Sequence, residues 1–304
     1  AEYSKSSPEK IVIGNGSTEL IYLLTEIFLN RNDEVIIAEP TFTEYRKAVK
    51  VQGGKIRSIR LKKEENYRLK PSSIQEKISQ NTKLVFLCSP NNPTGRMIPL
   101  DDLKKAVETC EDYEAFVVLD EAFYEYCDHP QKYNVAGMEF NNLVSIRSLT
   151  KFYALAGLRI GYLIAPLTLA KVMREVKVQW NVNFLAQIAA KKAVVDSEFA
   201  ARTKKQTKEG KNFLWKELKK FGGLKTYPSH ANFFLINLSN SNISSNELAE
   251  ALLMRGITIR DCSNFKFLDE NFVRVCTRPL EDCKKLIECM NEINSKGDLD
   301  ENKP

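Results

Sequence analysis

The chain has 304 residues, of which 43% are hydrophobic and 28% are charged, and its formal net charge at pH 7 is +6. This length supports a large core and, at about 100–200 residues per domain, predicts two domains. No stretch approaches the roughly 20 continuous apolar residues of a membrane span, and residues 1–6 are too polar for a signal peptide, so we expect neither.

The cysteines and charges argue against several further classes of site. The seven cysteines are odd in number and form no Cys-x-x-Cys pair, so we expect no disulfide framework, no metal site and a reduced, cytoplasmic compartment. Lysines between residues 202 and 220 alternate with Phe213, Leu214 and Leu218, which predicts an amphipathic helix with a solvated basic face and not a nucleic-acid site. With two histidines and no Ser/His/Asp arrangement, a hydrolase is not expected.

The first motif, at residues 14–19, reads Gly-Asn-Gly-Ser-Thr-Glu and leads into a helix predicted over residues 18–30. Glycines followed by Ser17 and Thr18 at a helix N-terminus predict an anion site, because free backbone N–H groups point outward and the helix dipole favours a phosphate. The alternative is an ordinary cap, in which Ser17 or Thr18 closes the helix end and binds no ligand.

A second motif follows the next two predicted strands. Short apolar runs at residues 35–38 and 84–88 predict buried strands, with a helix over residues 41–52 between them. Residues 89–95, Ser-Pro-Asn-Asn-Pro-Thr-Gly, come directly after the second strand. Open α/β sheets bind ligands at the carboxyl ends of their parallel strands, so this turn is a candidate binding loop. A proline-fixed turn without a ligand is the alternative.

A carboxylate follows the strand predicted at residues 116–119, which comes after a helix over residues 99–111. Asp120, at the end of a buried strand, needs a cationic or hydrogen-bonded partner. The protonated nitrogen of a pyridine ring is one such partner, and an ionised aspartate there makes the ring an electron sink. A helix cap or a salt bridge is the alternative for Asp120, and we expect the neighbouring Glu121 to be structural.

The most informative segment is Ser-Leu-Thr-Lys at residues 148–151, which follows a strand predicted at residues 143–146. Lys151 has hydroxyl side chains three residues and one residue before it, and an arginine eight residues after it. This pattern suits a lysine that forms a Schiff base with a phosphorylated aldehyde cofactor, whose phosphate the hydroxyls and Arg159 would hold. The alternative is a solvated lysine in a polar loop.

The remaining elements complete an α/β fold with a mostly parallel sheet, helices on both of its faces, and a smaller α+β unit. A strand at residues 161–165 and a helix over residues 167–195 complete the sheet region. After residues 222–223 we expect short elements, with strands at 233–237, 257–259 and 272–275 and helices near 244–255 and 279–295.

The domain boundary is predicted within a long helix around residues 196–221. This gives a large domain of residues 1–208 and a small C-terminal domain of residues 209–304. We expect the terminal residues 296–304 to fray, because chain ends are poorly ordered unless they dock onto the fold.

These four segments, in this order and spacing, resemble the class I/II aminotransferases, which are pyridoxal-phosphate enzymes of fold type I. The resemblance covers residues from about 8 to about 292. It is closest to the branch that contains histidinol-phosphate aminotransferases and L-threonine-O-3-phosphate decarboxylases. It implies an aspartate-aminotransferase-like fold, pyridoxal 5′-phosphate as the cofactor, and a homodimer with its sites near the subunit interface.

Carried over residue by residue, the resemblance assigns the cofactor contacts. Lys151 would form the covalent link and later move a proton, Asp120 would pair with the pyridine nitrogen, and Asn92 would hydrogen-bond the ring 3-oxygen. Phe42 would stack on the ring, and Phe123 stands where the family usually has a tyrosine that also bonds the 3-oxygen. The phosphate ligands would be Ser17, Thr18, Ser148, Thr150 and Arg159.

The resemblance also assigns the substrate contacts. Arg274 matches the arginine that clamps the substrate carboxylate, Arg260 would bind the substrate phosphate, and Asn183 belongs to a segment near the substrate. Phe123 and the segments around Lys151 and residue 261 favour decarboxylation of L-threonine O-3-phosphate in cobalamin biosynthesis. Transamination between histidinol phosphate and 2-oxoglutarate is the alternative.

Two further expectations come from the family. Its members carry an N-terminal arm before the phosphate motif, including a tyrosine that reaches the neighbouring subunit's cofactor, and too few residues precede Gly14 to supply it. The same fold can serve as a ligand-sensing regulator fused to a DNA-binding domain. Because no helix-turn-helix segment is visible in the sequence, we favour an enzyme.

Overall fold

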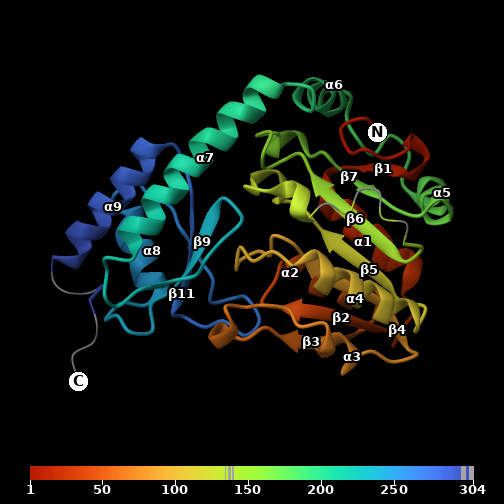
Figure 1. The fold of residues 1–304 in the computed structure, drawn as a ribbon, viewed down its shortest axis with the longest axis horizontal. Helices are drawn as coiled ribbons and strands as arrows, with labels where there is room; N and C mark the ends of the chain where they lie inside the picture. Colours follow the sequence, from red (N-terminus) through yellow and green to blue (C-terminus); the bar gives the residue numbers. More distant parts are fainter. Residues whose placement is uncertain (134, 136–137, 139, 296–298, 301–304) are drawn as a thin grey trace.

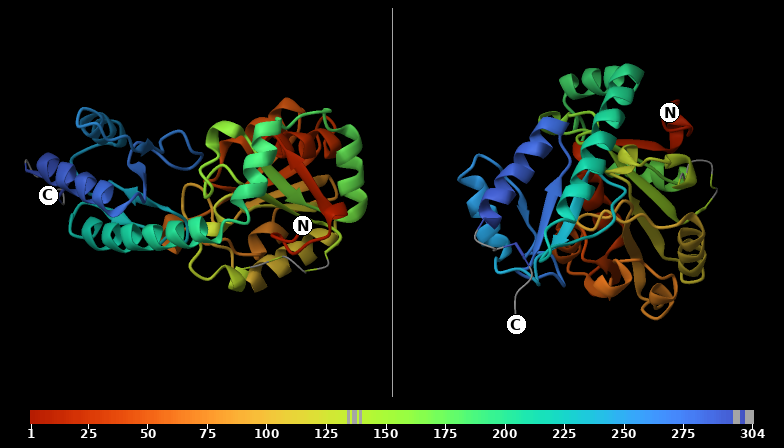
Figure 2. Two further views of the ribbon diagram at one scale, coloured as in Figure 1. Left: turned by 90° about the horizontal axis from the view of Figure 1, so that it is seen from above. Right: turned by 60° about the vertical axis from the view of Figure 1, so that its left-hand side comes forward.

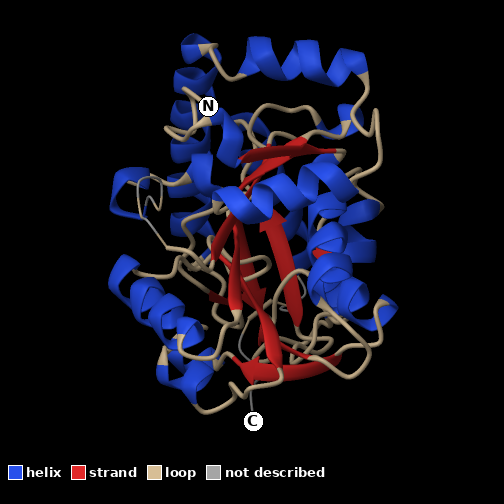
Figure 3. Cartoon of the chain, turned by 90° about the vertical axis from the view of Figure 1, so that its right-hand side faces the viewer, coloured by secondary structure: helices blue, strands red, loops and turns tan. Residues whose placement is uncertain are grey.

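The computed structural model describes residues 1–133, 135, 138, 140–295, 299 and 300. In this part of the chain, two units each contain one sheet, and the long helix α7 (Ser197–Leu218) runs between them (Figure 1). The strands lie in the interior and the helices surround them (Figure 3). No helix in the described residues has the length and apolar content that a membrane span requires.

The larger sheet has seven strands among the described residues, in the order β1-β7-β6-β5-β4-β2-β3. The pairs from β3 to β6 are parallel, whereas β7 pairs antiparallel with both β6 and β1. The predicted mostly parallel sheet is therefore confirmed. Its strands are β1 (Ile11–Gly14), β2 (Glu34–Glu39), β3 (Lys55–Arg60), β4 (Thr82–Cys88), β5 (Phe116–Asp120), β6 (Leu143–Ser148) and β7 (Gly161–Ile164).

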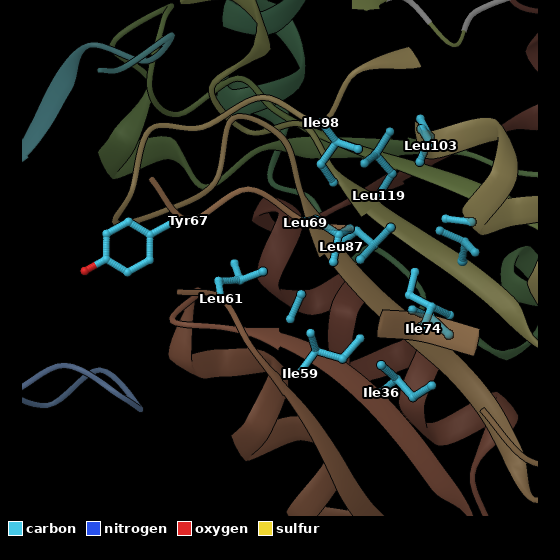
Figure 4. Close-up of a cluster of buried hydrophobic side chains, with 14 of the residues drawn as sticks. Ile36, Ile59, Leu61, Tyr67, Leu69, Ile74, Leu87, Ile98, Leu103 and Leu119 are labelled. Carbon is cyan, nitrogen blue, oxygen red and sulfur yellow. The ribbon is translucent and has the colours of Figure 1, made fainter. Parts of the chain in front are cut away.

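Helices cover both faces of this sheet because successive strand residues point to opposite sides. Val35 and Ile37 of β2 join a buried cluster with the helices α1 (Gly16–Phe28), α2 (Thr43–Val51) and α5 (Leu167–Val176). Ile36, between them, joins a second cluster with α3 (Ser72–Gln75) and α4 (Leu100–Glu111), part of which is drawn in Figure 4.

The smaller unit lies to one side of the larger one, with α7 running along it (Figure 2). Its antiparallel sheet has the order β10-β11-β9-β8. A third apolar cluster packs α7 and two further helices against this sheet. The elements are β8 (Lys225–Thr226), β9 (Phe233–Asn237), α8 (Ser245–Leu253), β10 (Arg260–Asp261), β11 (Phe272–Cys276) and α9 (Leu280–Asn294).

The two units share part of their core. The cluster of Figure 4 also contains Tyr227, Leu235 and Phe265 of the smaller unit. The ring of Tyr67 meets that of Tyr227 edge-on, with 5.0 Å between centroids. This contact holds the edge of the smaller sheet beside the carboxyl ends of the larger one. The proposed division at residues 208/209 falls inside α7 and stays a prediction.

Two predicted elements are wrong. The helix over residues 167–195 is divided into α5 and α6 (Phe184–Ala193), because Trp180 has a positive φ of 53° and the Asn183 side chain caps α6 by accepting from the Ala186 N–H. Residues 257–259 form no strand, and pairing with β11 begins at Arg260. The prediction also missed β1, β3 and β8, of which β3 is an edge strand rich in Lys and Arg.

The predicted fraying of the C-terminus concerns residues 296–298 and 301–304, which lie outside the described residues. It is wrong for Leu299, which is fully buried in the core of the smaller unit. The Leu299 carbonyl accepts from the Gly223 N–H at 3.0 Å, and its own N–H donates to Asn294 at 2.7 Å. A hydrophobic anchor thus docks this part of the chain.

Candidate active site

The carboxyl ends of β4, β5 and β6 meet at one edge of the larger sheet, as parallel strands require, and open onto a pocket of about 270 Å³. The smaller unit closes the pocket with residues from β10, β11 and the loop between them. The lining residues are Ser17, Thr18, Phe42, Thr43, Cys88, Asn92, Asp120, Ala122, Phe123, Thr150, Lys151, Arg159, Arg260, Phe265 and Arg274.

The pocket brings together the residues predicted to bind cofactor and substrate, with two exceptions. Ser148 lies behind Thr150, and Asn183 lies at the start of α6. The prediction missed Thr43, Cys88, Ala122 and Phe265, although three of them adjoin predicted residues or end a predicted strand. Phe265 had no such signal, because a loop of the smaller unit carries it into the pocket.

The N-terminus of α1 faces the pocket with its first backbone N–H groups free of a side-chain cap. The residue before it, Asn15, makes no side-chain cap, and its own N–H donates to Glu19 at 2.7 Å. The first backbone N–H groups of the helix are therefore available to a ligand, and the alternative of a cap by Ser17 or Thr18 is wrong. The guanidinium of Arg159 lies against Gly16, where a Cβ would be 2.8 Å from an Arg159 nitrogen, and glycine is favoured at this position because its φ is 76°.

The loop after β6 presents Lys151 to the pocket. The hydroxyls of Ser148 and Thr150 are both buried and lie 2.7 Å apart in a hydrogen bond, and the Thr150 N–H also donates to Ser148 at 3.3 Å. These bonds fix the turn from which Lys151 extends. The turn itself is buried, whereas the Lys151 side chain is exposed and lines the pocket, so both interpretations of Lys151 stay predictions.

The surroundings of Lys151 favour its neutral amine. Desolvation by the pocket walls is the main cause that lowers the pKa of Lys151, and the nearby positive charge of Arg159 adds to it. Asp120 opposes this effect and Arg274 reinforces it. A neutral amine is the form that attacks an aldehyde carbon, so this lowering agrees with the covalent role predicted for Lys151.

Asp120 is 3% exposed and makes no helix cap. One carboxylate oxygen accepts from the Tyr45 hydroxyl at 2.7 Å, and the other accepts from the Ala122 N–H at 2.9 Å. Burial raises the pKa of Asp120, and these two hydrogen bonds, together with the charge of Lys151, oppose the rise. Both hydrogen-bond donors are neutral, so neither neutralises the carboxylate, and a cation in the pocket would stabilise its charged form.

Behind Asp120, two charged side chains join the segment that follows β5 to the strand β6. Glu121, expected to be structural, is 1% exposed and accepts hydrogen bonds from Ser145 and from Arg147, the latter at 3.1 Å. The Arg147 guanidinium also lies over the Tyr124 ring, 4.3 Å from its centroid. This buried ion pair holds the residue after Asp120 against the end of β6, the strand that leads into the Lys151 turn.

Two arginines of the smaller unit face the pocket. Arg260 and Arg274 are direct partners across the antiparallel β10–β11 pair, so their side chains leave the sheet on the same face. Arg274 donates to the Asn92 side chain and lies 4.8 Å over the Phe233 ring. Arg260 donates to Asn264 at 2.9 Å. Both guanidinium groups keep donors for a ligand.

Of the two remaining predicted residues, Phe123 lines the pocket and Asn183 does not. Phe123 lines the pocket, and its ring meets Phe233 edge-on at 5.0 Å. Asn183 does not line it: besides capping α6, it donates to the Leu158 carbonyl at 3.1 Å, next to the Arg159 turn. Its predicted contact with substrate stays a prediction.

Comparison with known proteins identifies the family. A family model described as aminotransferase class I and II matches residues 1–290. The chain belongs to this family. The resemblance found in the four sequence motifs is thus confirmed, and with it the class of enzyme.

The similar proteins include both histidinol-phosphate aminotransferases and an L-threonine-O-3-phosphate decarboxylase. A histidinol-phosphate aminotransferase of Methanococcus aeolicus is 35% identical over 294 residues, covering 96% of this chain and 78% of the relative. The crystal structure of a histidinol-phosphate aminotransferase from Clostridium acetobutylicum matches with a TM-score of 0.90 and 29% identity, over 97% and 86% of the two chains. That of an L-threonine-O-3-phosphate decarboxylase from Porphyromonas gingivalis matches with a TM-score of 0.83 and 26% identity, over the same shares.

Enzymes of this family depend on pyridoxal 5′-phosphate, and the pocket fits that cofactor. Lys151 offers an amine for its aldehyde, and the buried Asp120 carboxylate needs a cation that the pyridine nitrogen can provide. The uncapped α1 terminus and Arg159 match a phosphate. When bound, the cofactor supplies the electron sink that stabilises a carbanion at the substrate.

Proposed function

We propose that this enzyme is a histidinol-phosphate aminotransferase, which passes the amino group of histidinol phosphate to 2-oxoglutarate. The observation that supports it most is the number of cations at the pocket: Arg159, Arg260 and Arg274 all line it. Arg159 would neutralise the cofactor phosphate, which leaves two arginines for anionic groups of the substrates. Our preference from the sequence was the decarboxylase, and the greater similarity to relatives named for histidinol phosphate reverses that order.

The pocket residues divide the work between holding the cofactor and handling the substrate. Asp120 would pair with the pyridine nitrogen, Asn92 would bond the ring 3-oxygen, and Phe42 would stack on the ring. Lys151 would hold the cofactor covalently, release it to the substrate amine, and then move the proton between substrate and cofactor carbons. The phosphate would be bound by Ser17, Thr18, Thr150 and Arg159, with Ser148 orienting Thr150.

The two arginines of the smaller unit would recognise the substrates. Arg260 would bind the phosphate of histidinol phosphate, and Arg274 would clamp the α-carboxylate of the dicarboxylic partner in two parallel hydrogen bonds. Their adjacency across β10 and β11 places both donors at one mouth of the pocket. A substrate with an amine and a phosphate at opposite ends would span from Lys151 to Arg260.

Decarboxylation of L-threonine O-3-phosphate is the second candidate, and Phe123 favours it. The usual tyrosine at this position would bond the cofactor 3-oxygen, and Phe123 removes that hydroxyl. The bond that breaks is the one perpendicular to the cofactor ring, so an enzyme that holds the carboxylate out of the ring plane releases carbon dioxide. This choice depends on the placement of Arg274 and Arg260 at the scale of an ångström.

One experiment separates the two reactions. Purified enzyme with pyridoxal 5′-phosphate is offered histidinol phosphate with 2-oxoglutarate, and separately L-threonine O-3-phosphate without a keto acid. We expect glutamate from the first mixture and no carbon dioxide from the second. Carbon dioxide from threonine phosphate, with no glutamate from histidinol phosphate, would establish the decarboxylase and leave the cofactor site unchanged.

We also propose that the enzyme is a cytoplasmic homodimer. The segment around α6 exposes large apolar side chains, with Trp180 94%, Val178 74% and Phe184 71% exposed. Such a patch is typical of an interface between subunits. Light scattering should report twice the chain mass, and Phe184→Asp should shift the protein towards the monomer, whereas Val51→Asp, on another exposed position, should not.

A further inference from the structure

Tyr45 touches the central carboxylate of the site from outside the pocket. Its side chain is fully buried, and its hydroxyl donates to Asp120 at 2.7 Å. The residue lies in α2, on the face of the sheet opposite to the cluster of Figure 4. Nothing in the sequence motifs marked it, because its role depends on a contact between residues 75 positions apart.

The ring of Tyr45 is held on two sides. It stacks on Phe86 of β4 with 4.9 Å between centroids and 8° between planes. Its edge meets the ring of Phe42 at 5.6 Å and 84°, and Phe42 lines the pocket as the predicted partner of the cofactor ring. Tyr45 therefore contacts both the residue that would cover the cofactor face and the residue that would bind its nitrogen.

The hydroxyl is a permanent donor. Burial raises the pKa of Tyr45 well above its usual value, and the negative charge of Asp120 raises it further, so the phenol stays protonated at neutral pH. The other titratable groups that face Asp120 are Cys88 of β4, the neighbouring Glu121 and Lys151. Burial also raises the pKa of the Cys88 thiol, so this group stays uncharged.

We propose that Tyr45 is a positioning residue for the reaction: its hydroxyl fixes the orientation of the Asp120 carboxylate and stabilises its charged form, so that the pyridine nitrogen stays protonated. The inference rests on the role of Asp120 in the proposed function. A carboxylate that loses this donor holds its own proton more tightly. The shared proton then moves from the ring nitrogen to Asp120, and the cofactor becomes a weaker electron sink.

Tyr45→Phe tests this directly, because it removes the hydroxyl and keeps the ring against Phe86 and Phe42. The probe is pyridoxal 5′-phosphate labelled with nitrogen-15 in the ring, whose chemical shift reports protonation of that nitrogen. In the wild-type holoenzyme we expect the shift of a protonated nitrogen. In Tyr45→Phe it should move towards that of the neutral ring, and the Kd for the cofactor should rise about tenfold.

Two matched variants make the result specific. Tyr227→Phe removes the hydroxyl of another fully buried tyrosine, one that lies outside the pocket lining, and should leave the nitrogen shift and the Kd unchanged. Asp120→Asn should give the neutral-ring shift. If Asp120→Asn does so while Tyr45→Phe matches the wild type in both shift and Kd, the role of Tyr45 is wrong. If Asp120→Asn itself leaves the nitrogen protonated, the assignment of Asp120 fails instead.

A second substitution covers the case in which Tyr45→Phe does not fold. Incorporation of 3-fluorotyrosine at position 45 keeps the shape and the hydroxyl and makes the hydroxyl a stronger donor. The ring nitrogen should then stay protonated to a higher pH than in the wild type. An unchanged titration of the nitrogen-15 shift in this protein would overturn the proposal.

Discussion

The two sides of the pocket are built differently. On the side of the larger sheet, Asp120, Ser148 and Thr150 are each at most 4% exposed, and hydrogen bonds between neighbouring loops hold them. On the side of the smaller sheet, Arg260 is exposed and projects from a strand of two residues. On the larger sheet, the exposed Lys151 and Arg159 thus reach into the pocket from a buried and braced base, which suits a fixed cofactor; we call this the cofactor side. The side of the smaller sheet, here called the substrate side, has no such base beneath Arg260.

The largest effect on activity is expected from replacing Lys151, the residue at the centre of the cofactor side. Lys151→Ala should lower kcat by at least roughly 10⁴-fold, because the covalent bond and the proton carrier are lost together. Borohydride reduction of the wild-type holoenzyme should trap the cofactor on Lys151, as peptide mass spectrometry would show, and no such adduct should form in the variant. Lys204→Ala, on the exposed face of α7, is the control and should behave as the wild type. A wild-type protein that neither turns yellow nor labels would contradict the assignment.

A second test concerns the buried carboxylate that underlies the cofactor side. Glu125 is 6% exposed and accepts from the Tyr3 hydroxyl at 3.1 Å. Burial raises its pKa from 4.5 to about 7, while the charge of Arg147 opposes the rise. The folded state therefore prefers protonated Glu125, and this stabilisation is complete below about pH 4.5 and is lost as the pH rises towards 7.

Glu125→Gln should remove that dependence. Relative to the wild type, the free energy of unfolding of the variant should increase by about 3 kcal/mol between the two ends of this pH range. Urea unfolding at a series of pH values measures the difference, and the exposed Glu26→Gln serves as the control. Parallel pH profiles for wild type and Glu125→Gln would show that Glu125 is ionised in the folded protein.

A third test asks whether Arg159 binds only the cofactor phosphate or also the substrate. Arg159→Ala should weaken binding of pyridoxal 5′-phosphate by about ten- to a hundredfold, since a hydrogen bond to a charged group contributes about 1.5–3 kcal/mol. The KM for the amino donor, measured at saturating cofactor, should change much less. Cofactor titration by fluorescence gives the first quantity and initial rates give the second. If cofactor affinity and the KM for the amino donor changed by the same factor, Arg159 would contact the substrate as well as the cofactor.

On the substrate side we expect the opposite pattern, in which the KM for substrate changes and the affinity for the cofactor does not. Arg260→Ala and Arg274→Ala should each raise the KM of the substrate they bind by about tenfold, the lower end of the same range. Cofactor affinity should stay that of the wild type, and Arg255→Ala, whose side chain faces Glu292, should change neither. Arg260→Ala should also discriminate less between phosphorylated and unphosphorylated substrates. Unaltered discrimination would remove Arg260 from the phosphate site.

Much of the cofactor side was predictable from sequence because Ser17 and Thr18 open a helix and the other key residues follow apolar strands. Parallel strands bring their carboxyl ends together, so Asn92, Asp120 and Lys151 had to converge once the strands were recognised. The bracing residues were not predictable: Tyr45 and Arg147 lie in ordinary helix and strand positions, and their partners come from other elements.

The secondary-structure predictions were wrong where the local sequence pattern was weak. The apolar content of residues 167–195 suggested one helix, and the capping role of Asn183 at Phe184–Ala193 was hidden by the expectation that this residue binds substrate. The edge strand β3 reads Lys-Ile-Arg-Ser-Ile-Arg, so its two isoleucines form no apolar run and the strand was missed. Arg274 and Arg260 were identified through family resemblance, whereas their pairing across β10 and β11 came from the structure.

The shortness of β10 makes the substrate side open to change by insertion or deletion. Side chains alternate across a strand, so a shift of one residue in the preceding loop would turn Arg260 away and bring a neighbour to its place. Since Asp261 is one of those neighbours, a single-codon event could replace a cation at the mouth of the pocket by an anion. An enzyme changed in this way would keep the same cofactor chemistry and would accept amines that carry a cation in place of the phosphate.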